Sequence, residues 1–164
     1  MILISGQAVL KSTSSSDDEL KELFQDPKIL NNMTETRLYP KKTPTEMIFR
    51  IERDDKLIGE LKFHSIRWFN RKAMLSVILI EEYQKKGIGT EALKTAIKFA
   101  FEKMNLHRLE AEVIEFNQPS KKLVEKLGFK LEGTLREAKY SGGKYWDIYR
   151  YGLLRKEYQE WREE

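Results

Sequence analysis

The chain has 164 residues, of which 40% are hydrophobic, so it is long enough to bury the core of one folded domain and is not a wholly disordered tail. It contains no cysteine and only two histidines, His64 and His107, which excludes disulfide scaffolds and cysteine-ligated metal sites and disfavours a catalytic metal. Thirty lysines and arginines against 26 aspartates and glutamates give a net charge of +4, interspersed along the chain, whereas a purely electrostatic nucleic-acid binder concentrates its positive charge.

The first half of the chain predicts one helix followed by three strands. A capping-box pattern beginning at Ser16 indicates the start of the helix, and Pro27 indicates its end. The next two strands flank the turn signal Asp54-Asp55. A third strand is almost continuously apolar, as is typical of a strand with both faces buried. These strands are expected at residues 47–53, 56–63 and 73–80.

The second half predicts two helices between further strands. Apolar residues recur at steps of three and four from Ile88 to Met104, the signature of an amphipathic helix. A shorter helix opens at Asn117 and stops at Gly128. This order predicts a single α/β or α+β domain over residues 1–164, with a parallel strand–helix–strand unit at its centre. The remaining strands are expected at residues 108–114, 129–136 and 145–154.

The sharpest local feature is the loop Gln84-Lys85-Lys86-Gly87-Ile88-Gly89-Thr90, between the apolar strand and the long helix. Its glycines let backbone approach a ligand, and the free N–H groups of a helix N-terminus favour an anion such as a pyrophosphate. A plain glycine-rich turn is one alternative. A dinucleotide site is another, but that fold begins with this unit and needs several further strand–helix repeats. A Walker loop is excluded because no glycine-lysine-serine/threonine sequence follows.

Several spaced motifs occur in order between residues 73 and 154. They are the loop from Gln84 to Gly89, then Asn117-Gln118-Pro119-Ser120, Leu127-Gly128-Phe129, Glu132-Gly133 and Tyr145-Trp146-Asp147-Ile148-Tyr149. Together they resemble the GCN5-related N-acetyltransferase (GNAT) superfamily, and within it the ribosomal-protein N-terminal (Rim-type) acetyltransferases. The resemblance implies the GNAT fold, a single mixed, mostly antiparallel sheet with a central splayed pair of parallel strands, flanked by helices.

The resemblance also implies acetyl-coenzyme A as co-substrate, bound where the two central strands separate. The backbone of Val77, Ile78 and Leu79 would pair with the pantetheine arm as an added strand does. The loop from Gln84 to Thr90 would hold the pyrophosphate. Asn117 would contact the pantetheine side of the cofactor, and a helix-capping role for it can coexist with that contact.

Three residues are candidates for proton transfer. Glu112 matches the catalytic glutamate of one Rim-type branch and would act as general base, with charge pairing to neighbouring basic residues as the alternative. Ser120 matches a serine implicated as the acid in another branch, with helix capping as its alternative. Tyr140 is a further proton donor, although aromatic residues of a strand pair also build cores. Two departures stand out: Met74 replaces a glutamate, and Val124 replaces a proton-donating tyrosine that is typical of polyamine acetyltransferases.

The motifs therefore predict an acetyl-CoA-dependent N-acetyltransferase that moves the acetyl group directly to a primary amine, because no cysteine is present to form an acyl-enzyme. A protein N-terminal α-amine is the expected acceptor. A small amine (polyamine, aminoglycoside or amino acid) and a catalytically silent coenzyme A-binding module are the alternatives. We expect no metal, no nucleic-acid or membrane partner, and a monomer or homodimer. We also expect a cytoplasmic location, because Met1-Ile2-Leu3-Ile4 has no basic leader and apolar runs are far shorter than about 18 residues.

Overall fold

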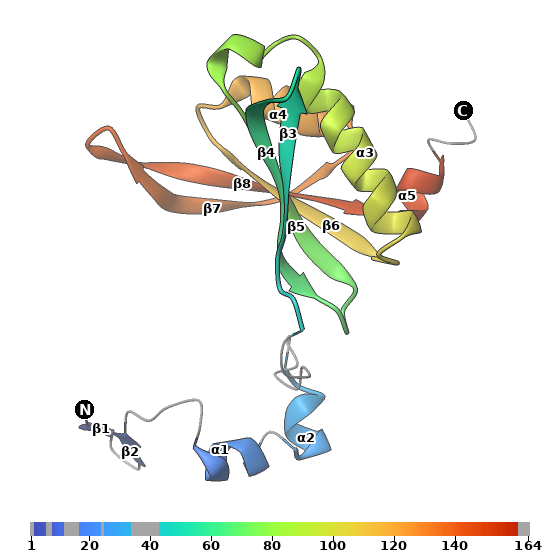
Figure 1. Cartoon of the computed structure of the whole chain (residues 1–164). Coiled ribbons are helices and arrows are strands. Elements are labelled where there is room, and N and C mark those ends of the chain that lie inside the picture. The colour runs from blue at the N-terminus through green and yellow to red at the C-terminus, as the bar shows by residue number, and fades with distance from the viewer. Residues whose placement is uncertain (1, 6–7, 12–16, 24, 34–42, 161–164) are drawn as a thin grey trace. The chain divides into compact units, whose positions relative to one another are not determined.

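The computed structural model describes residues 2–5, 8–11, 17–23, 25–33 and 43–160 (Figure 1). The chain divides into two compact units, Met1–Thr43 and Pro44–Glu164. The first unit holds two short antiparallel strands and two short helices, which are β1 (Ile2–Ser5), β2 (Ala8–Lys11), α1 (Asp18–Leu23) and α2 (Pro27–Leu30). The sequence predicted one helix in this region, and the two strands and α2 were not predicted.

Aspartates begin both helices of the first unit. The Asp17 carboxylate accepts a hydrogen bond from the backbone N–H of Leu20 at 3.2 Å, and Asp26 accepts one from Lys28 at 2.9 Å. Each satisfies an N–H group that a helix start leaves free. Ser16, the predicted cap, lies outside the described residues.

A six-stranded sheet forms the second unit, with strand order β3-β4-β5-β6-β8-β7. Every neighbouring pair is antiparallel except β5 and β6, which run parallel. This is the predicted mixed, mostly antiparallel sheet. Its strands are β3 (Met47–Arg53), β4 (Lys56–Arg67), β5 (Lys72–Leu79), β6 (Arg108–Ile114), β7 (Lys130–Ser141) and β8 (Lys144–Leu154).

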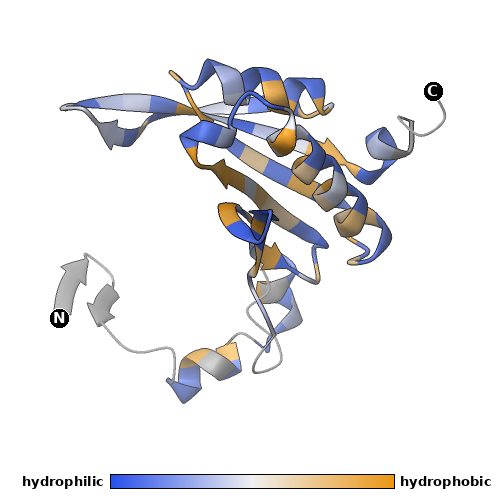
Figure 2. Ribbon diagram, turned by 45° about the horizontal axis from the view of Figure 1, so that its top comes forward, coloured by the Kyte–Doolittle hydropathy of each residue, from blue (hydrophilic) through white to orange (hydrophobic). Residues whose placement is uncertain are grey.

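Helices pack on one face of this sheet. Alternate strand residues such as Ala73, Leu75 and Leu109 are buried in one cluster with the apolar stripe of α3, as the period of two along a strand requires. Hydrophobic positions gather along the central strands and along α3 in Figure 2. The helical elements of this unit are η1 (Glu81–Tyr83), α3 (Ile88–Glu102), α4 (Gln118–Lys126) and α5 (Arg155–Glu160).

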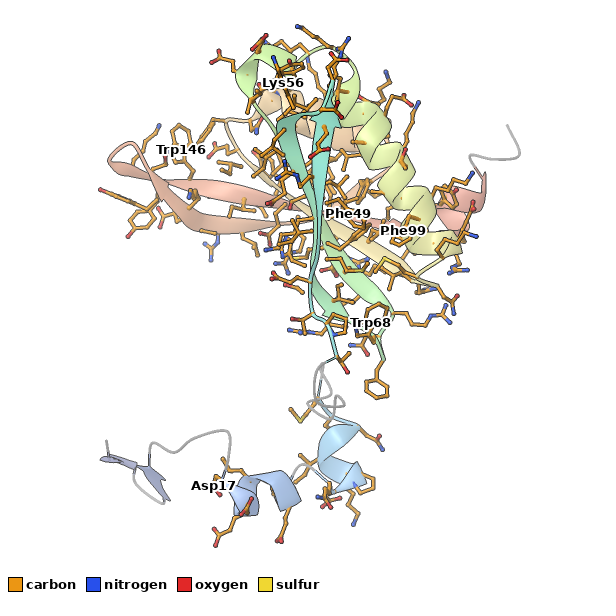
Figure 3. The ribbon with its side chains drawn as sticks, viewed as in Figure 1. Asp17, Phe49, Lys56, Trp68, Phe99 and Trp146 are labelled. Atoms are coloured by element: carbon orange, nitrogen blue, oxygen red, sulfur yellow. The ribbon has the colours of Figure 1, made fainter. Side chains whose placement is uncertain are left out.

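Aromatic side chains tie the edge of the sheet to α3. Phe49 of β3 and Phe99 of α3 are labelled in Figure 3. Their ring centroids lie 6.0 Å apart, edge to face, and the ring of Phe63 of β4 lies 6.3 Å from each of them. Such pairs contribute about 0.5–1.5 kcal/mol beyond the burial of their area. The contact holds the C-terminal half of α3 against β3 and β4.

Two strands are longer than the sequence predicted. β4 continues to Arg67 because its pairing with β5 resumes, at Arg67 and Lys72, after a register shift that follows His64. β7 continues to Ser141 because pairing with β8 resumes at Lys139 after a second irregularity. Irregular pairing breaks the period-two pattern on which the prediction rested. Among the described residues, no helix is both long and apolar enough to cross a membrane.

Candidate active site

The central strands β5 and β6 pair only at their beginnings. Their parallel register joins Lys72 to Arg108, Ala73 to Leu109 and Met74 to Glu110 and then ends, although β5 runs on to Leu79 and β6 to Ile114. The outer edges of both strands remain paired, β5 with β4 and β6 with β8. The two strands therefore diverge, which confirms the predicted splayed pair.

A cavity of about 230 Å³ lies where the strands diverge. Its walls come from β4, β5, β6, α3 and α4, and they include four of the predicted residues: Val77, Glu112, Asn117 and Ser120. The two departures from the family pattern, Met74 and Val124, also line it, together with His64.

The loop before α3 is open to an approaching ligand. Gly87 caps the helix in a left-handed conformation (φ +83°), and a Cβ built on it would meet nothing within 4 Å. No side chain caps α3, so the first N–H groups of a 15-residue helix face outward. Lys85 and Lys86 are exposed beside them, with the Lys86 ammonium 5.6 Å from the centroid of the Tyr83 ring. These features fit a diphosphate.

Gln84 joins this loop to the divergent end of β5. Its side-chain amide donates a hydrogen bond to the carbonyl oxygen of Leu79 at 2.8 Å. Ile78, between Val77 and Leu79 on β5, has 64% of its surface exposed. The predicted contact strand, Val77 to Leu79, thus leads from the cavity to the anion-binding loop. An extended acyl-carrying arm that ends in a diphosphate fits this path.

Asn117 and Ser120 are held together at the start of α4. The Asn117 side-chain oxygen accepts a hydrogen bond from the backbone N–H of Ser120 at 3.2 Å, so Asn117 does cap the helix. Both residues are half-buried, and both line the cavity. The hydroxyl of Ser120 takes no part in the capping bond.

Glu112 is paired with a basic residue of the next strand. The cross-strand register sets it opposite Arg150, whose guanidinium donates a hydrogen bond to the Glu112 carboxylate. This hydrogen bond raises the pKa of Arg150 above its ordinary value. Glu112 therefore lines the cavity as a carboxylate that Arg150 holds in place.

A second charged cluster lies at the paired base of the two central strands. Glu110 is 9% exposed and accepts hydrogen bonds from Arg108 at 2.8 Å and from Lys72 at 3.3 Å, while Arg108 also binds Glu132. Burial acts to raise the pKa of Glu110, but the hydrogen bond from Arg108 and the charge of Lys72 hold it below its ordinary value. Lys72 and Glu110 bridge β5 and β6 at the point where they begin to diverge.

Tyr140 is not brought to the cavity. It lies near the turn between β7 and β8, 61% exposed, with its ring 5.0 Å from that of its cross-strand neighbour Tyr145. The structure thus brings Glu112 and Ser120 together around the cavity, and it leaves Tyr140 out of the wall.

Sequence reasoning gave no role in the site to His64. Phe63 and Ile66, which flank it along β4, are buried, so a histidine between apolar positions on a strand was the available signal. Its place at the cavity depends on the pairing of β4 with β5, which periodicity does not specify.

Comparisons with known proteins agree with this geometry. Residues 9–149 match the family model described as the acetyltransferase (GNAT) domain. The N-acetyltransferase p20 of Bacillus licheniformis, named as uncharacterized, is 35% identical over 66% of this chain, and YdaF of Bacillus subtilis, named provisionally as a ribosomal N-acetyltransferase, is 33% identical over 65%. The matches span only 61% and 58% of these two relatives.

A longer match is the spermidine N(1)-acetyltransferase of Vibrio cholerae, 31% identical over 87% of this chain and 76% of the relative. A solved structure of spermidine/spermine N-acetyltransferase SpeG from the same organism, in mutant forms, has a TM-score of 0.70 at 28% identity and covers 90% of this chain and 81% of that chain. The chain belongs to the GNAT acetyltransferase family.

Proposed function

We propose that this protein is an acetyl-CoA-dependent N-acetyltransferase that acetylates a primary amine. The observation that carries the proposal is the divergence of β5 and β6 after three residue pairs, directly beside the uncapped N-terminus of α3. One feature provides an extended edge for an acyl-carrying arm, and the other provides N–H groups for a diphosphate. The family match over residues 9–149 supports the same activity.

The chain's own residues would bind and orient both substrates. Lys85, Lys86 and the N–H groups that start α3 would hold the diphosphate, and the edge of β5 from Val77 to Leu79 would hold the arm. Acetyl-CoA supplies an activated acyl group whose leaving thiol needs little help. Binding both partners in one cavity makes the transfer effectively intramolecular.

A base must act because an ammonium cannot attack a carbonyl carbon. Primary amines have pKa values from about 8 for an α-amine to about 10.4 for a lysine-type amine, so most are protonated at neutral pH. Glu112 is a candidate to accept that proton, and Ser120 is a candidate to protonate the departing thiolate. Tyr140, which lies outside the cavity wall, is a weaker candidate than either.

A small amine of the polyamine type is the acceptor that we favour. The Vibrio spermidine N(1)-acetyltransferase matches 87% of this chain, whereas YdaF, with its provisional ribosomal name, matches 65%. A protein N-terminal α-amine, the acceptor expected from the motifs, remains the second candidate because of YdaF. Val124 replaces the tyrosine typical of polyamine enzymes, so proton delivery to the thiolate must come from another group.

Two measurements test the proposal. Acetyl-CoA at about 100 times its dissociation constant should stabilise the protein by roughly 2.7 kcal/mol, seen as a rise in melting temperature. Free thiol should then appear on addition of spermidine, and more slowly with peptides that carry a free N-terminus. No change in melting temperature would refute the donor assignment. A change in melting temperature without thiol release from polyamines, aminoglycosides, amino acids or peptides would indicate a silent coenzyme A-binding module.

The oligomeric state needs its own measurement. The sequence led us to expect a monomer or homodimer, whereas one structure of the Vibrio cholerae spermidine N-acetyltransferase is described as dodecameric. We propose light scattering over a range of protein concentrations, with and without acetyl-CoA, so that the full span from monomer to dodecamer is covered.

A further inference from the structure

His64 lies beside Met74 on the neighbouring strand. The β4–β5 register sets His64 directly opposite Met74, the position at which the resemblance implies a glutamate. Directly opposed side chains share one face of a sheet, with Cβ atoms about 4.5–5.5 Å apart. The imidazole thus reaches the same region of the cavity from the neighbouring strand. Both residues line the cavity wall.

A β-bulge fixes the direction of this histidine. The β4–β5 ladder shifts register between His64 and Arg67, and the intervening Ser65 has a left-handed backbone (φ +50°). Bulges of this kind re-aim a side chain and are frequent beside active sites. The Ser65 hydroxyl lies 3.4 Å from Nδ1 of His64. A proton held on Nδ1 and shared with this hydroxyl leaves the lone pair of Nε2 free to accept one.

The charged groups around His64 are mostly paired with one another. Lys62, two residues earlier on the same face of β4, binds Glu46 at 2.8 Å, and that hydrogen bond is the main cause of the lowered pKa of Glu46. Across the sheet, Met74 separates His64 from Glu110, which Arg108 and Lys72 bind.

Glu112, on the opposite wall of the cavity, is bound by Arg150. A carboxylate is ordinarily a weaker base than an imidazole, and the hydrogen bond from Arg150 occupies one oxygen of Glu112. The two walls therefore present different groups to an acceptor amine: an ion-paired carboxylate from β6 and an imidazole from β4.

We propose that His64 is the general base of the acetyl transfer, and this inference rests on the proposed function. Nε2 of His64 accepts a proton from the acceptor ammonium, directly or through one water. The freed lone pair on nitrogen then bonds to the acyl carbon, and the carbon–sulfur bond breaks with its electron pair going to sulfur. The second proton on nitrogen passes to the thiolate, with the Ser120 hydroxyl as the candidate carrier, so the products are the amide, the thiol and one proton on the imidazole. Glu112, which forms an ion pair with Arg150, lines the other side of the cavity and takes no proton in this step.

The chain offers a matched control because it contains only two histidines. His64→Gln keeps a hydrogen-bonding side chain of similar size but cannot titrate, and His107→Gln makes the same change at an exposed residue outside the cavity wall. With acetyl-CoA and spermidine, kcat should fall by about 10²- to 10⁴-fold in His64→Gln and stay within twofold in His107→Gln. The affinity for acetyl-CoA, measured by calorimetry, should be unchanged in both.

The pH profile separates a base from a merely structural residue. Wild type and His107→Gln should lose kcat on acidification as the base becomes protonated, and His64→Gln should lack that acidic limb. Added imidazole should partly restore turnover to His64→Ala. In the wild type, the Hε1 proton resonance of His64 should shift on addition of acetyl-CoA, and that of His107 should not. Melting curves would show that each variant is folded.

Two results would overturn the assignment without touching the proposed function. The first is that the wild type is active and His64→Gln keeps both its kcat and the acidic limb of its pH profile. The second is that Glu112→Gln, and not His64→Gln, loses the acidic limb, which would make Glu112 the base. Failure of the wild type to release thiol with any amine would refute the proposed function, and the role of His64 with it.

Discussion

Replacement of Gly59 by alanine should disturb the strand that we assign to acetyl-CoA binding. Gly59 of β4 lies opposite Leu79 of β5, and a Cβ built on it would stand 2.3 Å from the carbonyl oxygen of Ile78 and 2.7 Å from Cδ2 of Leu79. The first of these atoms belongs to the backbone, so a rotamer change cannot relieve the overlap. The absence of a side chain at this position lets β4 approach the end of β5.

The size of the effect follows from these distances. Real Cβ contacts are essentially never shorter than 3.0 Å, so the 2.3 Å contact must lengthen by at least 0.7 Å, the difference of the two values. Overpacking of this kind costs about 1–3 kcal/mol. At about 2–4 °C for each kcal/mol in a chain of this size, the melting temperature should fall by roughly 2–12 °C.

Gly133→Ala is the matched control, because Gly133 also lies in a strand and a Cβ there would meet nothing within 4 Å. Its melting temperature should stay level or rise by up to about 4 °C, since alanine reduces the entropy of the unfolded chain. Thermal unfolding followed by circular dichroism measures both variants, and calorimetry with acetyl-CoA should show weaker binding only for Gly59→Ala. Equal stability and equal affinity in the two variants would refute the argument.

Three further predictions concern backbone strain and titration. Gly87→Ala and Gly143→Ala place a side chain at φ +83° and +81°, so each should lose about 1–2 kcal/mol of stability, but only Gly87→Ala should weaken acetyl-CoA binding. Burial acts to raise the pKa of Glu110, yet the hydrogen bond from Arg108 holds that pKa below its ordinary value. The ionised Glu110 therefore contributes about 1–3 kcal/mol to the free energy of unfolding above pH 4.5, and this contribution is lost as the pH falls through the lowered pKa. Urea unfolding should therefore show Glu110→Gln less stable at neutral pH, with the difference vanishing in acid. Burial raises the pKa of Tyr151 to about 12, so its contribution is lost as the pH rises from 10 to 12, and Tyr151→Phe should flatten stability curves in that range.

Much of the fold follows from local patterns in the sequence. Residues 47–53 and 108–114 form strands with the predicted bounds, and the long helix begins at Ile88 as its apolar spacing indicated. Strong periodicity and turn signals are local properties, which explains this agreement. The ends of β4 and β7 were missed because irregular pairing, at His64 and after Leu135, interrupts the alternation.

Some features of the site could likewise be predicted from local sequence, and others depend on strand pairing. The glycine loop and the cap at Asn117 could be recognised because a helix start has its own sequence pattern, and both lie where the motifs indicated. The pairing of Glu112 with Arg150 joins residues 38 positions apart, so only the register of β6 against β8 reveals it. The position of Tyr140 is likewise decided by strand pairing, since this donor lies near the β7–β8 turn and not in the cavity wall.

The sequence by itself determined the family, the anion-binding loop and the net charge of +4. Its lack of cysteine favours direct transfer of the acetyl group. Lys85 and Lys86, exposed beside the start of α3, give part of that positive surplus a place. Only the tertiary structure decided which groups share the cavity, because separation of β5 from β6 and the bulge after His64 are properties of strand pairing. Register depends on contacts between segments that are distant in the sequence. Local propensity therefore does not predict that His64 lies opposite Met74 at the cavity.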